Sequence, residues 1–120
     1  MIITLCNQKG GAGKTTLSFL LASAFAEIGK SVGVIDFDPQ QTATRAITNL
    51  AKIDGTKINL TDDPAGFDIV FIDTPPRLDE TLAKALGMSD KVVLVSSPSP
   101  ADLWSTQESR DFVEKHSRLD

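Results

Sequence analysis

The sequence has little of what disulfide-stabilised and membrane proteins need. Its single cysteine, Cys6, can form no internal disulfide and cannot by itself hold a zinc ion or an iron–sulfur cluster. Its longest apolar stretch, residues 17–26, contains Ser18 and Ser23 and falls short of the roughly 18 to 20 residues of a membrane span. No basic leader stands at the start, so we expect no signal peptide and a cytosolic chain.

Positive charge is also scarce. Lys and Arg number 12 against 16 Asp and Glu, which gives a net charge of −4 at pH 7. The chain therefore shows no overall basic footprint for nucleic acid or for an anionic membrane. Its 41% hydrophobic content excludes a disordered chain, and its 120 residues allow one domain with a single core.

Short apolar runs alternate with helical patterns along the chain, without internal repeats. We expect strands at 2–6, 31–35, 57–60, 68–72 and 91–96, and helices at 15–28, 42–50, 79–88 and 101–116. Gly29 predicts a left-handed cap after the first helix. The continuous apolarity of 68–72 is typical of a strand covered on both faces. This alternation predicts an α/β fold, a mostly parallel sheet with helices on both faces.

The most informative segment is the glycine-rich loop between the first strand and the first helix, KGGAGKTT at positions 9–16. Glycines let successive backbone N–H groups converge, and a helix N-terminus adds about half a positive charge. Such a loop is shaped to bind a chain of phosphates, with Lys14 on the β- and γ-phosphates and the Thr15 hydroxyl on Mg²⁺. The alternative, a flexible glycine turn, is disfavoured by the strand–loop–helix context.

The loop departs from the common phosphate-loop pattern G-x-x-x-x-G-K-[ST], because Gln8 stands where the first glycine would be. Lys9 before two glycines resembles instead the deviant Walker A loop of the ParA/MinD family of ATPases. The resemblance implies that Lys9 reaches across a dimer interface to the partner's nucleotide; a merely solvated lysine would contribute almost nothing. The nucleotide-binding residues it implies are Lys9, Gly10, Gly11, Ala12, Gly13, Lys14, Thr15 and Thr16.

Two further segments resemble the same family. VIDFDPQ at 34–40 matches its D-x-D-P-Q element, which implies that Asp36 lies close to Mg²⁺ and that Asp38 orients the attacking water. FDIVFIDTPP at 67–76 resembles its Walker B strand, which implies that Asp73 binds Mg²⁺ through water. From local chemistry alone, Asp38 could merely begin a turn and Asp73 could merely end its strand. The resemblance thus implies a catalytic set of Lys9, Lys14 and Asp38 and a metal set of Thr15, Asp36 and Asp73.

The resemblance covers residues 2–106 and also implies an order of strands. The strands that end at Asp36 and Asp73 are expected on one side of the phosphate-loop strand, and 91–96 on the other. Proteins of this family are roughly twice as long, within the usual range of domain sizes. We therefore expect residues 1–120 to be a single P-loop NTPase domain without the C-terminal part of the usual family domain.

The leading hypothesis is a Mg²⁺-dependent ParA-type ATPase of plasmid or chromosome partitioning, with ATP and Mg²⁺ as cofactors. The resemblance implies a homodimer formed on ATP binding, nonspecific DNA and a centromere-binding adaptor as partners, no membrane contact, and a cytoplasmic, nucleoid-associated location. A MinD-like membrane-positioning ATPase would need a basic amphipathic C-terminal helix, whereas the ending ESRDFVEKHSRLD mixes both charges. An inactive nucleotide-binding fragment is the third hypothesis. GTP stays open as the nucleotide, although no N-K-x-D motif occurs.

Overall fold

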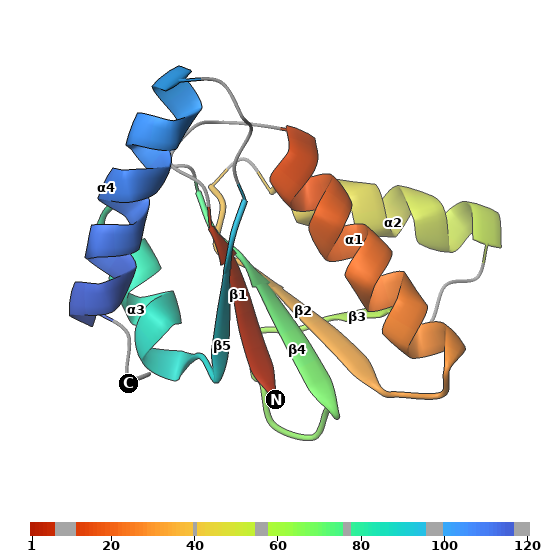
Figure 1. The fold of residues 1–120 in the computed structure, drawn as a ribbon. Coiled ribbons are helices and arrows are strands. Elements are labelled where there is room, and N and C mark those ends of the chain that lie inside the picture. Colours follow the sequence, from red (N-terminus) through yellow and green to blue (C-terminus); the bar gives the residue numbers. More distant parts are fainter. Residues whose placement is uncertain (7–11, 40, 55–57, 76–77, 96–99, 117–120) are drawn as a thin grey trace.

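The computed structural model describes residues 1–6, 12–39, 41–54, 58–75, 78–95 and 100–116. Strands and helices alternate through these residues, as the sequence pattern predicts (Figure 1). In chain order the elements are β1 (Ile2–Cys6), α1 (Ala12–Glu27), β2 (Val32–Asp36), α2 (Thr42–Asp54), β3 (Ile58–Leu60), β4 (Ile69–Asp73), α3 (Glu80–Met88), β5 (Lys91–Leu94) and α4 (Pro100–His116).

The strands form one parallel sheet in the order β3-β2-β4-β1-β5. The strand that ends at Asp36 lies beside the strand that ends at Asp73, and both lie on one side of β1. β5 lies on the other side of β1. The predicted α/β class, the parallel sheet and this order of strands are confirmed.

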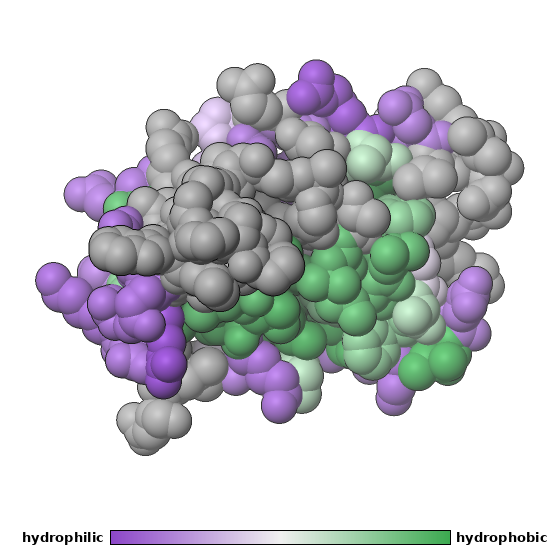
Figure 2. Space-filling model, turned by 45° about the horizontal axis from the view of Figure 1, so that its top comes forward, coloured by the Kyte–Doolittle hydropathy of each residue, from purple (hydrophilic) through white to green (hydrophobic). Residues whose placement is uncertain are grey.

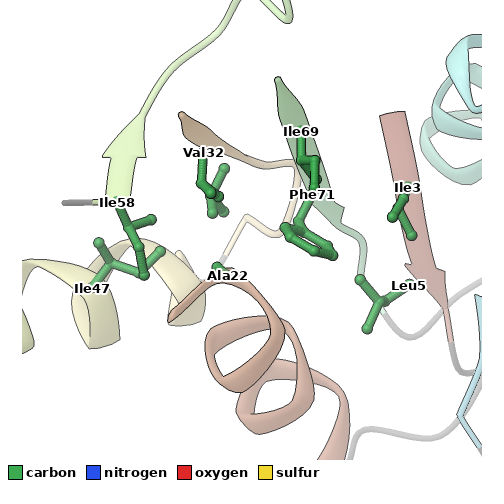
Figure 3. Packing of buried hydrophobic residues seen from close by; sticks show 9 residues of the cluster. Ile3, Leu5, Ala22, Val32, Ile47, Ile58, Ile69 and Phe71 are labelled. Atoms are coloured by element: carbon green, nitrogen blue, oxygen red, sulfur yellow. The ribbon is translucent and has the colours of Figure 1, made fainter. Parts of the chain in front are cut away.

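Helices cover both faces of the sheet, α1 and α2 on one face and α3 and α4 on the other (Figure 1). Alternate residues of a strand point to opposite faces, so each face receives its own apolar set. On the α1 face, Phe71 and Val32 point toward Ala22 of α1 (Figure 3). Phe71 is completely buried, and burying a side chain of this size contributes about 1.5–3 kcal/mol.

The opposite face combines an apolar cluster with a buried pair of hydroxyl groups. Leu82 and Leu86 of α3 pack with Cys6, which is 1% exposed. Beside them the hydroxyl groups of Thr4 and Ser89 are hydrogen-bonded to each other, and Ser89 Oγ also donates to the carbonyl oxygen of Ala85 at 2.7 Å. These buried polar groups therefore have the partners that their burial requires.

The ends of α1 and α3 follow from their flanking residues. Gly29 has φ +89°, and the backbone N–H groups of Gly29 and Lys30 donate to the carbonyls of Ala26 and Phe25, each at 3.1 Å. This pattern is a Schellman motif, so the predicted left-handed cap is confirmed. Asp79 is the N-cap of α3 rather than its first residue, because its Oδ1 accepts from the N–H groups of residues 81 and 82.

Several other boundaries differ from the predicted ones. α1 begins at Ala12 rather than at residue 15, and α2 continues to Asp54 because nothing before Gly55 breaks its pattern. β2 and β4 each extend one residue further, to Asp36 and Asp73, because the parallel register pairs these two aspartates.

One part of the surface is unusually apolar. Leu20 of α1 is 58% exposed, and Ile28, which directly follows this helix, is 69% exposed. Figure 2 shows hydrophobic side chains gathered on the visible face of the molecule.

Within the described part of the chain, β5 pairs with a strand on one side only. In the same residues, no helix combines the length and apolar character needed to cross a membrane.

Candidate nucleotide and metal site

The candidate site lies at the carboxyl edge of the sheet. Because β1, β2 and β4 are parallel, their last residues, Cys6, Asp36 and Asp73, reach the same edge. Helix α1 begins at this end of the molecule (Figure 1). Open α/β sheets bind ligands outside the carboxyl ends of their strands. The fold therefore brings the predicted Walker B strand, the D-x-D-P-Q strand and the start of the phosphate-loop helix together.

Asp73 lies completely buried at the centre of this edge, with 0% of its surface exposed. Its Cα is paired with that of Leu5 on one side and with that of Asp36 on the other, and neighbouring strands are about 4.8 Å apart. The next residue, Thr74, donates from Oγ1 to the carbonyl oxygen of Leu5 at 2.9 Å. The carbonyl oxygen of Asp73 accepts from the N–H of Phe37 at 2.9 Å. These bonds fix the ends of β2 and β4 relative to each other and to β1.

Asp36 is held by its carboxylate as well as by its backbone. Oδ1 accepts from the N–H of Asp38 at 3.0 Å, and Oδ2 accepts from the N–H and the Oγ1 of Thr44 at 2.9 Å and 2.8 Å. Hydrogen bonds to an ionised acceptor are stronger than those between neutral groups. The carboxylate of Asp36 therefore has a defined orientation beside Asp73.

Asp38 begins a turn, which is the alternative that its local chemistry left open. Its carbonyl oxygen accepts from the N–H of Gln41 at 2.9 Å, and Gln41 has a positive φ of 54°. The turn carries the chain from β2 into α2 and keeps Asp38 at the carboxyl edge. The turn and the implied catalytic role are therefore compatible, because Asp38 follows the last residue of β2 by two positions and so stays at the edge where Asp36 and Asp73 lie.

The first part of the glycine loop falls outside the described residues. Lys9, Gly10 and Gly11 lie in the range 7–11, which is not described. The backbone of residues 12–16 forms the first turns of α1. The side chains of Lys14, Thr15 and Thr16 are likewise outside the description. The fold does place the N-terminus of α1 within this segment, at the carboxyl edge, where the helix dipole favours phosphate.

The oxygen ligands near this edge suit Mg²⁺. This ion is usually bound by one or two carboxylates and completes its octahedron with water and substrate phosphates. Asp36 and Asp73 supply two neighbouring carboxylates, and a cation beside Asp73 would offset the cost of burying its charge. Within the described ranges no group of three His, Cys, Asp or Glu could hold a metal.

Thr44 is a residue of this edge that the sequence analysis did not single out. It lines an open hollow of about 280 Å³, together with Val34, Asp36, Gln41, Leu60, Thr61 and Asp62. No local pattern signals its contact with Asp36, because the contact depends on how α2 packs against the end of β2.

Comparison with known proteins agrees with this geometry. The AAA domain family matches residues 1–62. The maintenance of carboxysome distribution protein A of Gloeobacter kilaueensis is 34% identical over 112 residues, which cover 85% of this chain and 51% of that protein. The chromosome-partitioning ATPase Soj of Thermus thermophilus is 30% identical over 131 residues, which cover 77% of this chain and 53% of that protein.

A similar fold is found in the crystal structure of a plasmid partition protein from Borrelia burgdorferi. Its TM-score is 0.80 at 23% identity, and the match covers 95% of this chain and 72% of that chain. The chain spans about half the length of the curated relatives it matches. From the family match over residues 1–62 and these relatives, the chain belongs to the ParA/MinD-type family of P-loop ATPases.

Proposed function

We propose that the protein is a Mg²⁺-dependent ATPase that acts in plasmid or chromosome partitioning. The observation that carries the proposal is the pairing of Asp36 with Asp73 at the sheet edge where the phosphate-loop helix begins. The names of the similar proteins support the cellular role, since one is a chromosome-partitioning ATPase and another a plasmid partition protein.

The loop residues 9–16 would bind the nucleotide through their backbone N–H groups, and Lys14 would contact the β- and γ-phosphates. Thr15, Asp36 and Asp73 would hold Mg²⁺, the two carboxylates through water. When bound there, Mg²⁺ would supply positive charge to offset the negative charge that develops on the phosphate oxygens. These residues bind and orient the substrate, and most of the catalysis of phosphoryl transfer comes from such positioning and charge stabilisation.

Asp38 would orient the attacking water by accepting its hydrogen bond. The main chain on both sides of Asp38 is fixed, by Asp36 before it and by Gln41 after it. A fixed main chain limits where the carboxylate can lie, and orienting a nucleophile in this way can lower the barrier substantially. Lys9 would complete the site from the partner subunit, where an added positive charge of this kind is worth roughly 10³ to 10⁵ in rate.

The partners are proposed for the whole protein. ATP binding would bring two subunits together through Lys9, and the dimer would bind nonspecific DNA and a centromere-binding adaptor in the cytoplasm, on the nucleoid. The net charge of −4 provides no overall basic footprint in these 120 residues. The DNA contact would therefore need a local basic surface or residues outside this sequence.

A second function, a nucleotide-binding module without turnover, is favoured by a specific observation. Leu20 of α1 and Ile28 just after this helix are exposed, and the described part of β5 is paired on one side only. Apolar surface and an edge strand of this kind promote association with other chains. ATP binding without hydrolysis by the purified chain would support this second function.

Calorimetric titration with ATP and Mg²⁺, together with a phosphate-release assay, tests the proposal. We expect Lys14→Ala to abolish tight binding, whereas Lys9→Ala and Asp38→Ala keep binding and lose most hydrolysis. Lys115→Ala is the matched control, because Lys115 is an exposed lysine in the last turn of α4. Absence of both ATP binding and turnover in the unmodified protein, with DNA and adaptor present, would contradict the proposal. Equal loss of binding in all three variants would contradict the assigned roles.

A further inference from the structure

Thr44 contacts the carboxylate of Asp36 through two groups at once. Its backbone N–H and its hydroxyl both donate to Oδ2, at 2.9 Å and 2.8 Å. The other oxygen, Oδ1, accepts from the N–H of Asp38 at 3.0 Å. One carboxylate therefore joins the first turn of α2 to the main chain of Asp38.

These bonds restrict rotation of the Asp36 carboxyl group. Because both oxygens are engaged, a rotation about the Cβ–Cγ bond would disturb the bonds to Thr44 and to Asp38 together. The hydroxyl of Thr44 supplies one of the two bonds that hold Oδ2. Loss of that hydroxyl would loosen the carboxylate and, through Oδ1, the peptide group of Asp38.

Helix α2 also depends on this contact at its N-terminus. Its first turn contains no acidic residue, and Gln41, which precedes it, is not a favoured N-cap. Asp36 therefore supplies, from the end of β2, the acceptor and the negative charge that the first turn of a helix attracts. The same aspartate thus anchors α2 and the turn that carries Asp38.

We propose that Thr44 is a positioning residue for ATP hydrolysis: through Asp36 it fixes the main chain at Asp38 and so directs the Asp38 carboxylate. The inference rests on the proposed function, in which Asp38 orients the attacking water. Thr44 acts through Asp36 and is not assigned to the nucleotide-binding loop. Its replacement therefore lowers the rate of hydrolysis and leaves nucleotide affinity nearly unchanged.

The open hollow beside the contact allows the hydroxyl of Thr44 to be removed with little effect on stability. Thr44→Val keeps the shape and β-branching of the side chain and removes its hydroxyl donor. Water can enter the open hollow of about 280 Å³ and hydrate Oδ2, so little stability is lost. Thr61→Val makes the same change elsewhere in the lining of the hollow, where the hydroxyl donates to the carbonyl oxygen of Asp63 at 3.0 Å.

The experiment compares the unmodified protein with Thr44→Val, Thr44→Ser and Thr61→Val. Three quantities are measured: kcat for ATP, the Kd for ATP by calorimetry, and the hydrogen-exchange rate of the Asp38 amide by NMR. We expect Thr44→Val to lower kcat about tenfold, to change Kd less than about twofold, and to speed exchange at Asp38 several-fold. Thr44→Ser restores the hydroxyl, so it and Thr61→Val stay within about twofold of the unmodified protein.

Two different failures can be told apart. Unchanged kcat and unchanged Asp38 exchange in Thr44→Val, in a protein that hydrolyses ATP, would overturn the positioning role of Thr44. An equal fall of kcat in Thr44→Ser would also overturn it, because the serine keeps the hydroxyl. If the unmodified protein neither binds nor hydrolyses ATP, the proposed function fails instead. The exchange rate at Asp38 then decides whether Thr44 fixes this main chain: faster exchange in Thr44→Val supports it, and unchanged exchange overturns it.

Discussion

The backbone at Gln41 offers a direct test of how the chain turns from β2 into α2. Gln41 has φ 54°, in the left-handed region that side chains other than glycine rarely adopt, and it immediately precedes α2. We expect Gln41→Gly to increase the free energy of unfolding. The carbonyl oxygen of Gln41 accepts the N–H of Arg45 at 3.0 Å, and glycine keeps this main-chain bond.

The magnitude follows from two opposing terms. A left-handed conformation costs a residue with a side chain about 1–2 kcal/mol, and glycine avoids this cost. Glycine in turn loses more backbone entropy on folding, which costs about 0.5–1 kcal/mol. The side chain of Gln41 is exposed, so its removal adds little. We therefore expect Gln41→Gly to increase the free energy of unfolding by about 0.5–1 kcal/mol, which raises Tm by roughly 2–4 °C for a chain of this length.

Thermal and urea unfolding followed by circular dichroism measure this gain, and two variants control for other causes. Gln41→Ala removes the side chain and keeps the backbone cost, so we expect a change below about 0.5 kcal/mol. Gly29→Ala places a side chain at φ +89°, where an added Cβ has no neighbour within 4 Å. Backbone strain less the entropy advantage of alanine therefore gives a net loss of about 0.5–1 kcal/mol. A Gln41→Gly protein no more stable than Gln41→Ala would refute the reasoning.

Two further predictions concern the core and the dependence of stability on pH. Leu86→Ala, at a completely buried site in α3, lowers the free energy of unfolding by about 2–5 kcal/mol. Its control, Leu20→Ala at a 58% exposed site, changes this free energy by less than about 0.5 kcal/mol. Similar losses in the two variants, measured by urea unfolding, would place Leu86 outside the core. The backbone N–H of Ser31, and then its side chain, lower the pKa of Asp68. A lowered folded-state pKa stabilises the fold above the unfolded pKa and ceases to do so as pH falls through the folded value. Asp68→Asn keeps an acceptor for Ser31 without a charge, so we expect its Tm to fall less than that of the unmodified protein between pH 5 and pH 2, and equal falls would show that Asp68 adds nothing.

Much of the fold follows from patterns that are local in the sequence. The apolar run Ile2–Cys6 predicts β1 with its observed bounds, and Gly29 predicts the left-handed end of α1. Both signals work because they depend on the chemistry of neighbouring residues. Boundaries were less accurate where a polar residue continues a strand. Asp36 and Asp73 extend β2 and β4 because each pairs with the other across the sheet, and a residue's pairing partner is not visible in its own segment.

The candidate site divides in the same way. The glycine loop can be recognised from adjacent residues in the sequence. The roles of Lys9, Lys14 and Thr15 stay predictions, because their side chains are not among those described. The two contacts between the Asp36 carboxylate and Thr44 could not be predicted. They join the last residue of β2 to a residue of α2, and only the packing of that helix against the sheet edge brings the groups within hydrogen-bond distance.

The sequence by itself determined which segments become strands and helices and that they alternate, and it predicts which loop binds phosphates. These properties come from side-chain periodicity and from the backbone freedom of glycine, which act over a few residues. Only the tertiary structure decided the register that pairs Asp36 with Asp73, the bond from Thr74 to Leu5, and the contact of Thr44 with Asp36. Each of these contacts depends on elements that meet only when the sheet and its helices pack together, because that packing buries their apolar faces.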